Sequence, residues 1–159
     1  MDSAKASAPL KRLLPFALLL GVFALGLAFP ISNFFVVRPH INNVSGDPNF
    51  APVSKILQSS CVDCHGVSSG LPAKPFYAGF PIAKDTIARD MLEGQKSFKL
   101  TEGQVSGKDL ISNIDLAKIT TVVEEGSMPP IRYKALHWDA SLNQQQRQAI
   151  LKYIASRQE

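Results

Sequence analysis

The stretch Cys61-Val62-Asp63-Cys64-His65 decides how this chain of 159 residues is interpreted. It holds both cysteines of the sequence, three positions apart, and a histidine follows the second one directly. This C-x-x-C-H spacing lets two thiols add to the vinyl groups of one porphyrin and places an imidazole beneath the iron. The pattern therefore predicts one covalent haem c, with Cys61 and Cys64 as attachment sites and His65 as the proximal ligand.

Two other chemistries can use the same five residues. A zinc site needs about four nitrogen or sulfur ligands, so the cysteine pair would have to be completed from His65, His137 and His40. A thioredoxin-like dithiol needs a surrounding pattern of strands and helices, and the sequence lacks that pattern. Haem attachment is the favoured interpretation, and zinc or dithiol chemistry is the alternative.

The N-terminal part of the chain predicts a membrane anchor. An uncharged apolar run from Leu13 to Ile31 would span roughly 28 Å as a helix, close to the hydrocarbon thickness of a bilayer. Pro15 and Pro30 are expected near the helix ends, where a proline costs least. Since apolar residues continue beyond Ile31, we expect a transmembrane signal-anchor over residues 13–37.

A cleaved secretory signal is the competing interpretation, because Gly26-Leu27-Ala28 offers small residues at a possible cleavage site. In either case the basic residues within 1–12 predict a cytoplasmic start by the positive-inside rule. The rest of the chain would then lie on the periplasmic side of the cytoplasmic (inner) membrane, as a single-pass protein. Beyond Arg38 the charges nearly balance, so no nucleic-acid partner is expected.

The exported part is expected to be all-α. Residues 38–47 read as a polar tether, and residues 48–159 read as one small haem c domain. Apolar periodicity predicts helices near 52–60, 82–93, 109–125 and from 141 onward. We expect glycines to end two of these helices, and Ser141 to begin the last one with Gln144 in a capping box. The two glycines are Gly94 and Gly126.

Met128 is the predicted distal iron ligand. Pro129 and Pro130 follow it and hold the backbone out of a helix, so the loop can present the thioether at little ordering cost. His137 is the alternative ligand, and a bis-histidine site would have a lower reduction potential. Met91 lies in an apolar helical stripe and is interpreted as core, and His40 as solvated.

The segment after Met128 carries candidate haem contacts. Arg132, Tyr133 and Trp138 each offer a hydrogen bond or a charge that suits a haem propionate, as does Lys134. Long basic side chains are also common on ordinary surfaces, so these residues remain possible contacts.

Taken together, these motifs resemble class I c-type cytochromes and, more closely, a small bacterial haem-binding domain family. The likeness covers roughly residues 50–157. The stretches that carry it are Cys61-x-x-Cys64-His65, Phe80-Pro81-Ile82-Ala83-Lys84-Asp85 and Met128-Pro129-Pro130-x-x-Tyr133-x-x-Leu136-His137-Trp138. The resemblance implies haem on Cys61 and Cys64, with His65 proximal and Met128 distal. Val53 and Leu57 depart from class I, because a glycine and an aromatic residue usually stand there, where the first and last helices cross.

The sequence therefore predicts a membrane-tethered monohaem cytochrome that transfers single electrons between redox partner proteins and is not an enzyme. A constellation of catalytic side chains is not recognisable in it. One alternative is a sensor or a peroxidase-like site with an open or labile distal position. Another is a fixed haem subunit of a larger membrane oxidoreductase complex.

Overall fold

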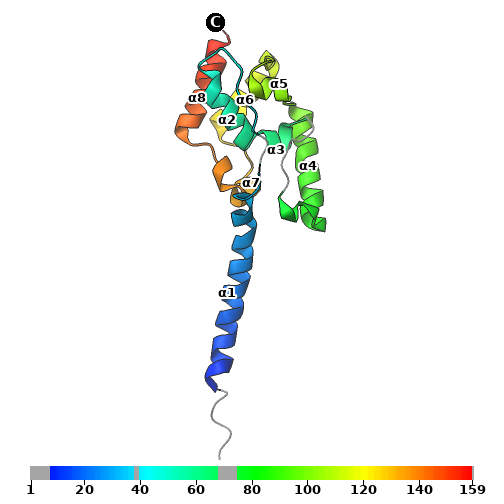
Figure 1. Ribbon diagram of the computed structural model, residues 1–159, viewed down its shortest axis with the longest axis vertical. Coiled ribbons are helices and arrows are strands. Elements are labelled where there is room, and N and C mark those ends of the chain that lie inside the picture. The colour runs from blue at the N-terminus through cyan, green and yellow to red at the C-terminus, as the bar shows by residue number, and fades with distance from the viewer. Residues whose placement is uncertain (1–7, 38–39, 68–74, 159) are drawn as a thin grey trace, which may run out of the picture.

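The computed structural model describes residues 8–37, 40–67 and 75–158 of the chain. Every regular element in these ranges is a helix, apart from one isolated bridge between Gly66 and Leu100. Figure 1 shows one long helix, α1, with its C-terminal end against a cluster of shorter helices. The expectation of an all-α fold with one N-terminal apolar helix is confirmed.

Helix α1 (Ala8–Asn33) is the apolar N-terminal element. Its segment Leu13–Asn33 is long and apolar enough to cross a membrane, and only 6% of the most apolar part is buried by the rest of the protein. The helix ends at Asn33 and not at Val37, and Pro15 and Pro30 both lie inside it. The Asn33 side chain donates to Tyr77 Oη at 2.9 Å and to the Leu136 carbonyl at 2.7 Å.

The described part of the expected tether packs against the domain. Ile41 is buried, and its backbone exchanges two hydrogen bonds of 3.0 Å with the Gln58 side chain. Val44 N–H donates to the Ser106 carbonyl at 2.8 Å. These pairings satisfy the backbone of a segment without regular structure, so residues 41–44 form a strap along the domain and not a free spacer.

The core lies between α2 (Phe50–Ser60), α6 (Asn113–Glu125) and α8 (Gln144–Ser156). Val53 and Leu57 of α2 are both almost fully buried. The rings of Phe50 and Tyr153 contact each other where α2 meets α8, with centroids 5.0 Å apart. The first and last helices of the domain therefore pack together without the glycine and aromatic pair of class I cytochromes.

Two predicted helix starts are corrected. Helix α6 begins four residues later than expected, because Ser112 caps it by accepting from Asp115 N–H, and a separate helix α5 (Glu102–Ser106) precedes it. Helix α8 is capped by Asn143 in a capping box with Gln146, and not by Ser141. The 3₁₀ turn η2 (Trp138–Ala140) leads into an extended Ser141, so the next residue able to cap takes the role.

The apolar residues in and just before α6 divide into a buried and an exposed set. Leu116, Ile119 and Val123 are buried, whereas Leu110, just before the helix, and Ile114 are 65% and 72% exposed. Both sets have helical spacing, so periodicity alone does not choose between them. The predicted end of α6 at Gly126 is confirmed, because Gly126 adopts the left-handed conformation (φ 66°) that favours glycine at this position.

Candidate haem site

A cleft with an empty volume of about 1190 Å³, including space open to solvent, lies between α3 (Val62–His65), α4 (Pro81–Ser97), α6 and the loop after α6. Cys61, Cys64, His65 and Met128 all line this cleft. Its walls are largely apolar, and the other apolar lining residues are Leu57, Phe98, Ile119, Val122, Val123, Pro129, Pro130, Leu142 and Ile150.

The two cysteines lie where α2 passes into α3. Cys61 lies between the two helices, as the C-cap of α2 and the N-cap of α3, and Cys64 lies within the single turn of α3. Burial is the main cause that raises the pKa of Cys61 to about 12 and that of Cys64 to about 11. Dithiol oxidoreductases depend on thiols with a lowered pKa, so this environment argues against the dithiol alternative.

His65 is buried and held in one orientation. Its ring stacks on the Phe98 ring with centroids 3.8 Å apart, and its Nδ1 lies 3.1 Å from the Phe98 carbonyl oxygen. A carbonyl only accepts, so this bond places the proton on Nδ1 and leaves the Nε2 lone pair free. Burial lowers the pKa of His65, which favours the neutral form that ligates metals. In metal-ligating histidines, the ring nitrogen that does not bind the metal commonly donates its N–H to a backbone carbonyl.

Helix α4 continues through Gly94, where the sequence predicts its end, and runs to Ser97. A Cβ added at Gly94 would lie 2.9 Å from the Cys64 carbonyl oxygen. The glycine therefore permits close packing of α4 on the turn that carries the cysteines, and does not act as a cap. No residue of α4 is fully buried, and Ala88 and Leu92 are exposed, so the predicted apolar core stripe of this helix is only half covered.

Gly94→Val is expected to lower the free energy of unfolding by about 1–3 kcal/mol, the usual cost of overpacking. The contact partner is backbone and cannot rotate away, so α4 or α3 must shift. Thermal unfolding followed by circular dichroism measures the effect. Gly79→Val is the matched control, since a Cβ at Gly79 meets nothing within 4 Å; equal stabilities of the two variants would contradict the proposed role of Gly94.

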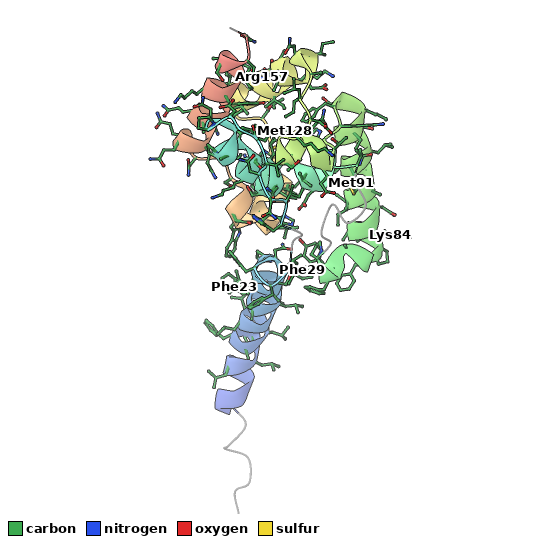
Figure 2. The ribbon with its side chains drawn as sticks, turned by 45° about the horizontal axis from the view of Figure 1, so that its top comes forward. Phe23, Phe29, Lys84, Met91, Met128 and Arg157 are labelled. Atoms are coloured by element: carbon green, nitrogen blue, oxygen red, sulfur yellow. The ribbon has the colours of Figure 1, made fainter. Side chains whose placement is uncertain are left out.

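The two candidate distal ligands lie in different places. Met128 lines the same cleft as His65 and is 40% exposed, and Figure 2 shows it in the part of the domain remote from α1. The Met128–Pro129 peptide bond is cis. His137 is buried and stacks on Tyr133 with centroids 4.0 Å apart. It lines an adjoining pocket that shares Cys64, Asp90, Arg132 and Tyr133 with the cleft, whereas Met128 lines the cleft together with His65.

The residues predicted as possible propionate contacts do not all line the cleft. Arg132 and Tyr133 line the cleft, whereas Trp138 does not. Arg132 makes a two-pronged ion pair with Asp90, at 2.7 and 2.9 Å, and Tyr133 Oη donates to the Asp63 carboxylate. Trp138 packs edge-on against Phe34 after the end of α1, with centroids 6.1 Å apart. Lys134 does not line the cleft either.

Sequence reasoning missed several residues that shape the cleft. Phe98, which orients His65, and Gly94 lie more than twenty residues from the cysteine motif, and only the fold brings them together. Arg89 and Lys118 line the cleft as additional cations. No local pattern marks Phe98, Arg89 or Lys118. For Gly94 the available signal was a glycine inside an apolar helical repeat, which suggests close packing.

The zinc alternative lacks ligands in the part of the chain that the structure describes, where no group of three or more His, Cys, Asp or Glu side chains is placed to hold a metal ion. His40 is exposed, and His137 shares a pocket with Cys64 but not with Cys61 or His65. A haem fits the cleft better, because the lining combines two thiols, an oriented imidazole and a thioether with apolar walls.

Comparison with known proteins agrees with this site. Cytochrome c peroxidase Ccp of Escherichia coli (strain K12) is 36% identical over 102 residues, which cover 63% of this chain and 21% of that protein. The chain thus spans about a fifth of the length of this curated relative. No solved structure matches the chain. The sequence model of the Haem-binding domain family matches residues 31–156, and the chain therefore belongs to this family.

Proposed function

We propose that the protein is a membrane-tethered, periplasmic monohaem c-type cytochrome that transfers single electrons between redox partner proteins. One observation carries the proposal: the cysteine pair, an oriented imidazole and a methionine thioether line one cleft. When bound, a haem supplies a one-electron couple at its iron. Membership of a haem-binding family supports an electron-transfer role.

Each of the four side chains has a distinct proposed role in binding the haem. Cys61 and Cys64 would hold the porphyrin through thioether bonds, which prevents its loss in the periplasm. His65 would ligate through Nε2, because Phe98 fixes its ring and its proton. Met128 would supply the distal sulfur, and histidine with methionine raises the reduction potential. If His65 and Met128 both bound the metal, substrates would be excluded from it, so the favoured function is electron transfer and not catalysis.

Low-temperature EPR spectroscopy of the oxidised full chain tests the ligand set. We expect a low-spin signal of the His/Met type, together with a sulfur-to-iron charge-transfer band in the optical spectrum. Carbon monoxide added to the reduced protein should leave the spectrum unchanged. A bis-histidine signal would contradict the role of Met128, and a high-spin signal with rapid carbon monoxide binding would contradict electron transfer as the only function.

The name of the relative favours a second candidate function. That protein is a cytochrome c peroxidase, and the partly exposed Met128 could release an axial position for a peroxide. Peroxide-dependent oxidation of a reduced donor by the purified chain alone would favour the enzyme over the electron carrier.

A further inference from the structure

We propose that the haem domain rests on the outer leaflet of the bilayer through an aromatic collar, and that this contact fixes its orientation. The collar comprises Phe34, Phe35, Phe76, Phe80 and Trp138. The proposal rests on the proposed function in one respect, namely that α1 crosses the membrane. It adds a lipid surface as a second binding partner of the domain.

The end of α1 is joined to the domain on two sides. Asn33 donates to Tyr77 on one side and to the Leu136 carbonyl of α7 (Ile131–Leu136) on the other. One turn earlier, Phe29 contacts the rings of the 3₁₀ turn η1 (Phe76–Gly79) and of the residue after it, with centroids 5.5 Å from Tyr77, 5.9 Å from Phe76 and 6.4 Å from Phe80. Figure 2 shows Phe29 at the top of α1, at the level where α4 begins.

The length of α1 decides where the lipid surface must lie. From Leu13 to Phe29 the helix rises only about 26 Å, and the hydrocarbon core is about 30 Å thick. If the inner boundary of the hydrocarbon core lies at Leu13, its outer boundary therefore lies beyond Phe29, towards Asn33 at the end of the 21-residue apolar segment. A tilted helix rises even less along the membrane normal. Rings that contact Phe29 thus lie at the depth of the outer interface.

The surface of the collar suits that depth. Its five side chains are 48% to 80% exposed although all are large and apolar. The indole N–H of Trp138 donates to the Ala135 carbonyl at 2.9 Å, so burying this ring in lipid leaves no unpaired donor. Tryptophan is enriched where membranes meet water, and phenylalanine is common on the apolar face of segments that lie in that interface. Lys84 and Asp85, both exposed near the start of α4, limit insertion to the head-group region.

The strap formed by residues 41–44 supports the fixed orientation of the domain. Because residues 41–44 lie along the domain, the domain has little freedom to move away from α1. The cleft is lined by α3, α4, α6 and the loop after α6, and these elements belong to the same packed body as the collar. A haem in the cleft would therefore keep a constant angle to the membrane plane.

Cross-linking to lipid tests the surface without relying on the haem. The full chain is reconstituted in nanodiscs of phosphatidylethanolamine and phosphatidylglycerol that contain a phospholipid with a diazirine close to its head group. After illumination, we expect lipid adducts in peptides 75–84 and 131–139 as well as in α1, and none in α8. Adducts confined to α1, or collar peptides cross-linked only to a second copy of the chain, would overturn the proposal.

EPR of oriented membrane multilayers tests the fixed angle. The wild-type signal should change with the angle between the membrane and the magnetic field. Phe76→Ser with Phe80→Ser should lose that dependence and the adducts at 75–84, whereas Leu110→Ser with Ile114→Ser, also exposed apolar residues, should keep both. Angle-independent wild-type spectra would reject the docked domain. Haem staining and resistance of the chain to alkaline extraction report separately on the proposed function.

Discussion

Replacement of both Cys61 and Cys64 by alanine is expected to abolish covalent haem attachment completely. These are the two cysteines of the chain, both line the cleft, and no other side chain can form a thioether with the porphyrin. Haem staining of a denaturing gel measures the loss. A single replacement leaves one thioether, so each single variant should retain a weaker stained band.

The double variant should also be less stable than the wild type. A small domain has few apolar residues to spare, and the apolar walls of the cleft would lose the group expected to cover them. Ser60→Ala is the matched control, because Ser60 lines the same cleft but offers no thiol. Staining of the double variant at the wild-type level would refute attachment at this motif.

The second large effect is expected for Met128→Ala. Haem should remain attached, because both cysteines are untouched, but the loss of the thioether should open one axial position. We expect a reduction potential lower by about 0.1 V or more, within the range of about 0.8 V that axial ligands span. Redox titration measures the potential, and the reduced variant should bind carbon monoxide, which the wild type does not.

His137→Ala separates the two candidate ligands. His137 stacks on Tyr133 and lines the adjoining pocket, whereas Met128 lines the cleft together with His65, so removal of His137 should change stability more than the potential. Its Nδ1 lies 3.2 Å from the Tyr133 carbonyl oxygen, which indicates a structural role in α7. A wild-type optical spectrum in Met128→Ala, with an altered one in His137→Ala, would reverse the assignment.

The sequence predicted the parts of this protein that depend on local patterns. The five-residue motif, the apolar helix and the glycine that ends α6 each carry their own signal, and the all-α class follows from them. Gly94 shows where such reasoning fails. A glycine after an apolar repeat indicates a helix end, but here the helix continues because Cys64 packs against that position.

The remaining differences also arise from contacts that are distant in sequence. Asn33 ends α1 against Tyr77 and Leu136, and Gln58 fastens the strap at Ile41. Phe98 orients His65 from more than thirty residues away. Hydropathy and spacing do not reveal such pairings, so the sequence alone predicted the haem-binding family better than the relation of the domain to its N-terminal apolar helix.

The intact mass of the purified protein under denaturing conditions tests the central claim most directly. We predict the mass of the polypeptide increased by one haem, because two thioether bonds survive unfolding. The same spectrum shows whether the N-terminal segment is retained. The mass of the bare polypeptide, in a preparation from cells competent to attach haem, would contradict the account.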